Sequence, residues 1–134
     1  MRKLVFLSFL CISLTVTGYV YWFYYHSIGI GYLNGYCQQF SLEGDLFKTY
    51  EGVLYLQAAD TSRGSKIPDT TQLVYFSVVD ESVADSLEHC VGKKMKVHYT
   101  RYKRSLPWRG NDYDARNKDR GQYIVDRIDQ VASE

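Results

Sequence analysis

The chain has 134 residues, of which 46% are hydrophobic and 23% charged, a composition typical of one small globular domain and not of a low-complexity chain. Its net charge of +1 includes Arg2 and Lys3, which precede the first apolar run. The rest of the chain holds 14 basic and 15 acidic residues, and this near-neutral balance argues against strong binding to a polyanion.

The first apolar run, residues 4–25, contains no charged side chain. Its 22 residues would form a helix of about 33 Å, enough to cross a bilayer core of about 30 Å. Arg2 and Lys3 place the N-terminus in the cytoplasm by the positive-inside rule. Residues 1–27 are therefore expected to be a signal-anchor in the inner (cytoplasmic) membrane, and residues 28–134 an extracytoplasmic domain. A cleaved signal peptide, with small residues at 16–18, is the alternative. Rings suited to a membrane interface gather at the far end of the run: Tyr19, Tyr21, Trp22, Tyr24 and Tyr25.

The next segments have the alternating pattern of strands. A curved first strand is expected over about 31–41, with Gly31 and Gly35 as kinks, followed by a turn at 43–45. Residues 47–57 alternate, so Tyr50 and Glu51 should face opposite sides of a second strand. The polar stretch 58–70 is expected to be a loop, and the β-branched and aromatic run 72–79 a third strand.

The hydrophobic period then changes from that of a strand to that of a helix. Val83, Leu87 and Cys90 share one helical face, which predicts a helix over about 82–91, capped by Asp80 or Ser82 and ended by Gly92. Alternation returns over 93–104, which predicts a fourth strand. A long loop, 105–121, precedes a last strand over 122–131.

Five strands with one helix between the third and fourth resemble the oligonucleotide/oligosaccharide-binding (OB) fold, a small Greek-key barrel. This resemblance covers residues 31–131 and rests on element order. It implies a mainly β domain whose ligands lie across the second and third strands, between the first and last connecting loops. The last of these loops contains SLPWRGN, residues 105–111.

Three motifs also resemble a group of small bacterial membrane-anchored proteins of undetermined role: GDLFKTYEGVL at 44–54, LPWRG at 106–110 and YIVD at 123–126. Residues 111–121 look like an extension of that group's shorter loop. Members of the group often carry a 6-phosphogluconate dehydrogenase label. The sequence lacks the nucleotide-binding βαβ unit of such an enzyme, so no nicotinamide cofactor is expected.

The candidate patch combines Tyr50 and Glu51 with Trp108 and Arg109 of the last loop. An ion pair between Glu51 and Arg109 would pin the loop to the barrel, and this interpretation is preferred over a ligand contact. Trp108 would either plug the space under the loop or remain exposed as a stacking platform.

Cys37 and Cys90 would be joined by a disulfide in an oxidising compartment, or remain two buried thiols. No histidine has metal-ligand spacing, and no catalytic motif occurs, so neither a metal nor a catalytic residue is assigned. A basic stretch with interleaved rings is expected to be a charged edge strand, with a path for a polyanion as the alternative: Lys93, Lys94, Lys96, His98, Arg101, Lys103 and Arg104, with Tyr99 and Tyr102.

The sequence therefore favours a non-enzymatic, membrane-anchored module of the cell envelope that binds a protein or a glycan. A single-stranded nucleic-acid or glycan-binding OB domain is the first alternative, and a dehydrogenase the last.

Overall fold

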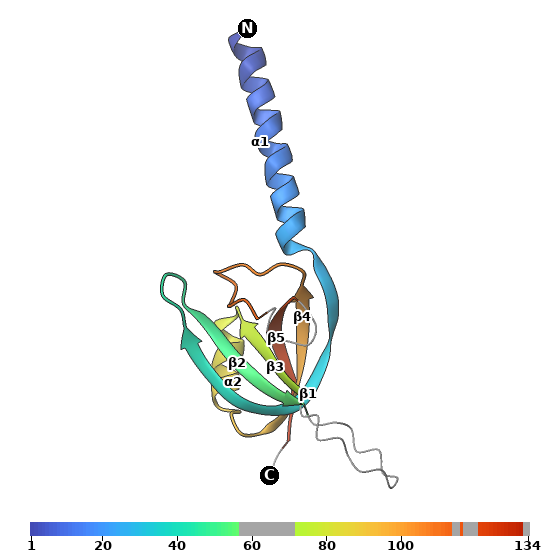
Figure 1. Cartoon of the computed structure of the whole chain (residues 1–134), viewed down its shortest axis with the longest axis vertical. Helices are drawn as coiled ribbons and strands as arrows, with labels where there is room; N and C mark the ends of the chain where they lie inside the picture. The colour runs from blue at the N-terminus through green and yellow to red at the C-terminus, as the bar shows by residue number, and fades with distance from the viewer. Residues whose placement is uncertain (57–71, 114–115, 117–120, 133–134) are drawn as a thin grey trace.

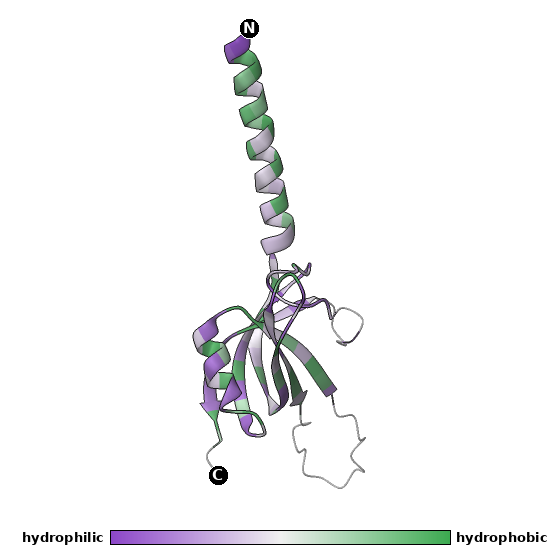
Figure 2. Ribbon diagram, turned by 90° about the vertical axis from the view of Figure 1, so that its left-hand side faces the viewer, coloured by the Kyte–Doolittle hydropathy of each residue, from purple (hydrophilic) through white to green (hydrophobic). Residues whose placement is uncertain are grey.

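The computed structural model describes residues 1–56, 72–113, 116 and 121–132. The first element, α1 (Arg2–Tyr25), extends away from the rest of the molecule (Figure 1). None of its residues is buried, and its mean hydropathy reaches 1.9 over 18 residues. Coloured by hydropathy, the helix is hydrophilic at its N-terminal end and hydrophobic to neutral along most of the rest (Figure 2). By length and composition the helix can cross a membrane, as either an anchor or a signal sequence.

The remaining described elements form a five-stranded sheet with one short helix. The strand order β1-β2-β3-β5-β4 returns to β1 and is that of a closed barrel. Neighbouring strands are antiparallel except for β3 and β5, which pair in parallel where Ser77 meets Ile124. The elements are β1 (Ser27–Glu43), β2 (Thr49–Leu56), β3 (Gln72–Val78), α2 (Glu81–Glu88), β4 (Lys94–Tyr102) and β5 (Gln122–Val131). The expected 58–70 loop lies outside the described residues.

Strand β1 is longer than the predicted 31–41 because it serves two partners. Its first part pairs with β4 from Ser27 onward, and its second part pairs with β2 to Glu43. Gly35 belongs to both pairings, and a Cβ there would lie 2.3 Å from the carbonyl oxygen of Tyr55. An irregularity between Cys37 and Gln39 follows at once. A bulge and a glycine let one strand curve from one neighbour to the next.

Helix α2 begins as the sequence indicates but is shorter than the predicted 82–91. The Asp80 side chain accepts the backbone N–H of Ser82, the role of an N-cap. The helix ends at Glu88, so Cys90 lies in the turn that follows. Gly92 closes that turn with φ +83°, a conformation that favours glycine.

Strand β4 is not an edge strand, contrary to the expectation. It pairs with β1 on one side and β5 on the other, because closure of the sheet removes its free edge. Its alternation is confirmed: Met95 and Val97 are buried, while Lys94 and Lys96 are partly exposed. The core lies between the sheet and α2 and contains Cys37, Leu54, Val74, Phe76, Val78, Ala84, Leu87, Met95, Val97, Tyr123 and Val125.

Candidate functional site

Residues 103–113, in the β4–β5 connection, cross the end of the barrel from which α1 emerges (Figure 1). The turn in this loop is tight, since the carbonyl of Leu106 accepts from the backbone N–H groups of both Arg109 and Gly110. Leu106 is buried beneath it. Gly110 packs so closely on β3 that a Cβ there would lie 2.1 Å from Ser77 Oγ. The chain needs glycine at 110 for the loop to approach the sheet.

Glu51 holds this loop through its carboxylate. The side chain is 3% exposed and accepts hydrogen bonds from Thr49 Oγ1 at 2.5 Å and Ser77 Oγ at 2.6 Å. A third bond, at 3.0 Å, comes from the backbone N–H of Asn111. Donors therefore surround both carboxylate oxygens, as a buried charge requires.

Arg109 is also buried, but it faces a different set of partners. Nε donates to Gln122 Oε1 at 2.5 Å, and Nη2 donates to the carbonyl of Arg104 at 2.6 Å. Nη1 donates to the carbonyl of Tyr24, in the last turn of α1, at 3.2 Å. The guanidinium lies 3.8 Å from the centre of the Tyr102 ring. Arg109 thus joins the loop, β5 and the end of α1.

The expected ion pair between Glu51 and Arg109 is not formed. Both side chains are described, and each is satisfied by other groups. The reason is the turn at Gly110. On one side of this glycine the Arg109 side chain lies against Tyr24, and on the other the backbone N–H of Asn111 lies against Glu51. The loop is therefore held at Tyr24 through the Arg109 side chain and at Glu51 through the backbone of Asn111.

The other two residues of the expected patch lie apart from this network. Tyr50 is half-buried against the core and stacks on Phe40. Trp108 is 54% exposed, and its ring meets the edge of Phe47 in the β1–β2 turn. Trp108 is therefore no plug beneath the loop.

Burial shifts the pKa of three groups, two in or near the loop and one in the core. It lowers the pKa of the Arg109 guanidinium, which nearby Tyr102 and Tyr25 partly oppose. It raises the pKa of Tyr113, whose ring stacks on Tyr75. In the core it raises the pKa of Cys37 to about 11, with a smaller contribution from nearby Cys90. Cys37 and Cys90 are both free thiols here, Cys37 buried and Cys90 partly exposed, and the choice between a disulfide and two buried thiols stays a prediction.

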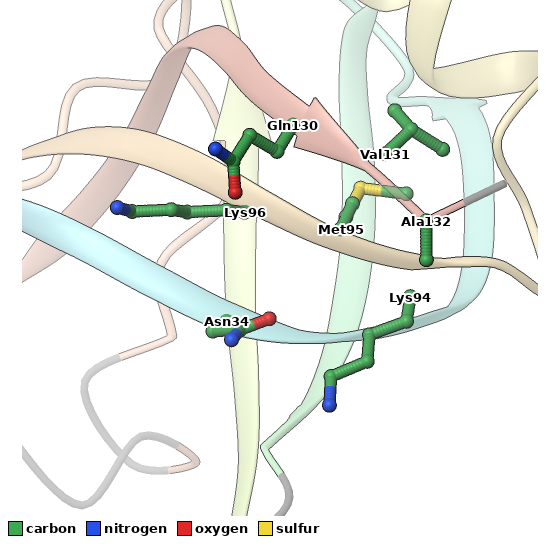
Figure 3. Close-up of a pocket in the computed structure, with 7 residues that line it drawn as sticks. All are labelled: Asn34, Lys94, Met95, Lys96, Gln130, Val131 and Ala132. Atoms are coloured by element: carbon green, nitrogen blue, oxygen red, sulfur yellow. The ribbon is translucent and has the colours of Figure 1, made fainter.

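A groove of about 490 Å³ lies where β1, β4 and β5 meet (Figure 3). Two lysines and two amides face it, and none of its lining residues carries a carboxylate. Its lining consists of Asn34, Lys94, Met95, Lys96, Gln130, Val131 and Ala132.

Beside this groove, two rings and an amide on β1 lie opposite three basic residues on β4, because the two strands pair in register. Tyr32 is paired with His98, Asn34 with Lys96, and Tyr36 with Lys94. The Lys96 ammonium lies 4.7 Å from the centre of the Tyr32 ring. We call these six side chains the β1–β4 ladder.

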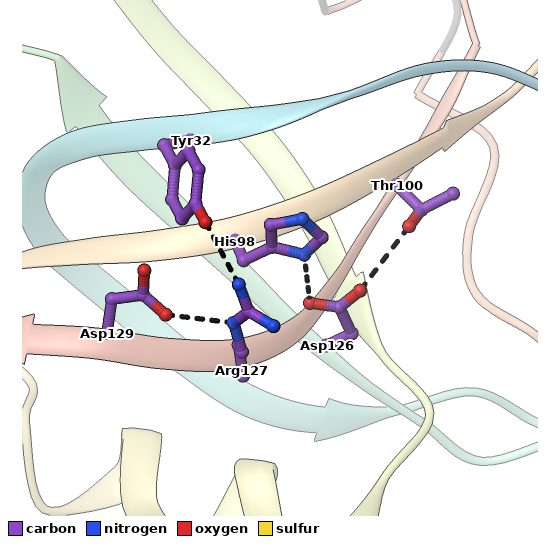
Figure 4. Close-up of polar contacts among 6 residues, drawn as sticks. All are labelled: Tyr32, His98, Thr100, Asp126, Arg127 and Asp129. Atoms are coloured by element: carbon purple, nitrogen blue, oxygen red, sulfur yellow. Dashed lines mark hydrogen bonds and ion pairs between the residues drawn. The ribbon is translucent and has the colours of Figure 1, made fainter.

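Two carboxylates beside the ladder, of Asp126 and Asp129, are engaged with His98 and Arg127 (Figure 4). Asp126 Oδ1 lies 2.5 Å from His98 Nδ1, and Asp129 accepts from Arg127 Nε at 2.9 Å. Arg127 also donates to the hydroxyl of Tyr32 at 2.9 Å. These contacts orient Tyr32 and leave the lysines as the cations that face the groove.

Sequence reasoning found the cations of this surface and the strand beside them, but not that Tyr32, Asn34 and Tyr36 of β1 lie next to those cations. The available signal was the alternation of the exposed residues Tyr32, Asn34 and Tyr36 with the more buried residues between them. Between β2 and β3, where the OB resemblance implies a ligand, the Glu51 carboxylate accepts from Ser77 and from the backbone N–H of Asn111 in the loop, and a ligand site there stays a prediction. Among the described residues, no group of three or more His, Cys, Asp or Glu side chains is arranged to hold a metal.

Comparison with known proteins gives one match. Residues 27–121 match the model of a family described as a domain of unknown function, DUF8785. The matched range runs from the start of β1 to the residue before β5 and includes the LPWRG loop. No curated protein and no solved structure matches the chain.

Proposed function

The chain belongs to the DUF8785 family, and we propose that it is a membrane-anchored, non-enzymatic module that binds an acidic glycan of the cell envelope on the β1–β4 ladder. We further propose that its domain is an OB-like Greek-key barrel. Support comes from the closed strand order, the long β1 shared between β2 and β4, the β3–β5 parallel pair, and the helix between β3 and β4.

The anchor is α1, retained in the inner membrane with the domain on its extracytoplasmic side. Arg2 and Lys3 precede the apolar run and favour a cytoplasmic N-terminus. Arg109 contacts the last turn of α1, and Arg104 lies 4.8 Å from the centre of the Phe23 ring. A helix that forms part of the domain's own contacts is better explained as an anchor than as a segment removed after export.

The composition of the ladder is the observation that carries the glycan proposal. Tyr32 and Tyr36 present half-exposed rings, Asn34 and Gln130 present amides, and the lysines supply positive charge. Rings cover the apolar faces of sugars, amides pair with hydroxyls, and ammonium groups pair with carboxylates. The domain as a whole is near neutral, which favours this local recognition over the extended charge that a nucleic acid demands.

The test is calorimetry of the full chain in detergent with an oligosaccharide of uronic acids. Lys94→Gln with Lys96→Gln should weaken binding by about tenfold or more, about 1.4 kcal/mol, because two charged contacts are lost. Lys93→Gln, an exposed neighbour outside the groove, is the matched control. Failure of the wild-type chain to bind the acidic sugar contradicts the proposal. Tighter, strongly salt-dependent binding of a single-stranded oligonucleotide would support the nucleic-acid alternative in its place.

A further inference from the structure

Three large apolar side chains are exposed at the end of the domain nearest α1. Leu46 and Phe47 lie in the β1–β2 turn, with exposed fractions of 85% and 45%, and Trp108 lies in the facing loop. The rings of Phe47 and Trp108 are in contact, with centroids 6.1 Å apart. We call these three residues the apolar rim. Clusters of large exposed apolar side chains are rare on small soluble domains and usually mark a surface that binds a partner.

The position of the rim relative to α1 identifies that partner. Trp108 precedes Arg109, whose guanidinium donates to the carbonyl of Tyr24 in the last helical turn. Both loops lie at the level where α1 ends (Figure 1). That end of α1 carries Trp22 and several tyrosines, residues that favour the boundary between lipid and water. The rim is thus held beside the plane in which the helix leaves the bilayer.

We propose that the apolar rim rests in the interfacial layer of the same membrane that α1 spans, so that the domain docks on the lipid surface in one orientation. This inference rests on the proposed retention of α1 as an anchor. Trp, Phe and Leu side chains are stabilised in this layer, because their apolar parts leave water while the indole N–H keeps polar partners. The ladder, which lies along the side of the barrel, remains open to solvent in that orientation.

The charges around the rim determine which lipids it needs. Lys48 and Arg104 are exposed nearby, but so are Asp45 and Asp112, which help to line the gap between the two loops. The positive and negative charges offset one another, so docking depends on the apolar side chains. Zwitterionic lipid should suffice, and added salt should change the docking little.

The experiment uses the full chain in phosphatidylcholine vesicles brominated at the top of the acyl chains. The chain has two tryptophans, so Trp22→Phe leaves Trp108 as the only reporter. We expect its emission to shift to the blue and to be quenched by bromine to an extent comparable with Trp22. Emission at the wavelength of water-exposed indole, without quenching, overturns the inference.

Three further variants make the outcome specific. Trp108→Phe leaves Trp22 to report α1: if Trp22 is quenched and Trp108 is not, the rim proposal fails while the anchor stands. If Trp22 is unquenched as well, the anchor fails and the rim proposal with it. In the Trp22→Phe background, Leu46→Asp with Phe47→Asp should abolish quenching of Trp108. Val91→Asp, at an exposed position in the turn before β4, is the matched control and should leave quenching unchanged.

Discussion

The carboxylate of Glu51 accepts the backbone N–H of Asn111, a residue 60 positions later in the chain, at 3.0 Å. This contact ties β2 to the β4–β5 loop without using any loop side chain. The contact needs a carboxylate, because Thr49 and Ser77 also donate to the same group, and a carboxylate can accept from all of these donors. The loop is therefore fastened to the sheet by one buried carboxylate, which accepts from Thr49, Ser77 and the backbone of Asn111.

Glu51→Gln should lower the free energy of unfolding by about 1–3 kcal/mol. The amide keeps the shape of the side chain but turns a donor toward groups that are themselves donors. Urea unfolding of the full chain in detergent measures the change. Glu43→Gln, at an exposed residue whose side chain contacts Ser41, is the control and should have little effect. Equal midpoints for the two variants would mean that Glu51 does not hold the loop.

Arg109→Lys should destabilise the domain and loosen its junction with α1. Lysine keeps the charge but lacks the planar fork that reaches Gln122, Arg104 and Tyr24 together. We expect a loss of about 1–3 kcal/mol on thermal unfolding and faster proteolysis between α1 and β1. Arg104→Lys, which retains a cation over Phe23, should change neither quantity. If Arg109→Lys and Arg104→Lys change thermal stability and proteolysis equally, the contact between the loop and α1 does not depend on the Arg109 guanidinium.

Gly110→Ala should be strongly destabilising, by about 2 kcal/mol or more, because the new methyl group would overlap Ser77 Oγ and Cβ. The loop would have to lift from the sheet and break the bond to Glu51. Gly29→Ala adds the same methyl group to β1 at ordinary contact distance, 3.5 Å from Arg101 Nε, and serves as the control. Denaturant midpoints compare the two, and a Gly110→Ala protein as stable as the control would contradict the close packing described above.

The buried thiol of Cys37 should make the reduced protein lose stability in alkali. Burial raises its pKa from 9.0 to about 11, so the unfolded chain releases this proton first as the pH rises. The contribution is complete below pH 9, falls between about pH 9 and 11, and amounts to roughly 2–3 kcal/mol. Unfolding free energies of wild type and Cys37→Ala, measured under reducing conditions across this range, should converge. A constant difference would mean that Cys37 does not titrate as a buried group.

Local patterns in the sequence were enough to define most elements. The uncharged run predicted α1, alternation predicted the inward faces of β2 and β4, and Asp80 predicted the start of α2. The sequence also predicted the order of strands and helix, because each element is recognised by the spacing of hydrophobic residues within a short stretch of chain. The ends of β1 and α2 did not follow, since pairing with two neighbours extends β1 and a tight turn shortens α2.

Only the tertiary structure determined which groups the candidate residues contact. The sequence placed Glu51 and Arg109 near the same loop, but only the closure of the sheet and the turn at Gly110 assigned them separate partners. The same closure made β4 an interior strand and brought its lysines beside Tyr32 and Tyr36. Composition and periodicity are properties of neighbouring residues, whereas a hydrogen-bond partner depends on the register between segments far apart in the chain.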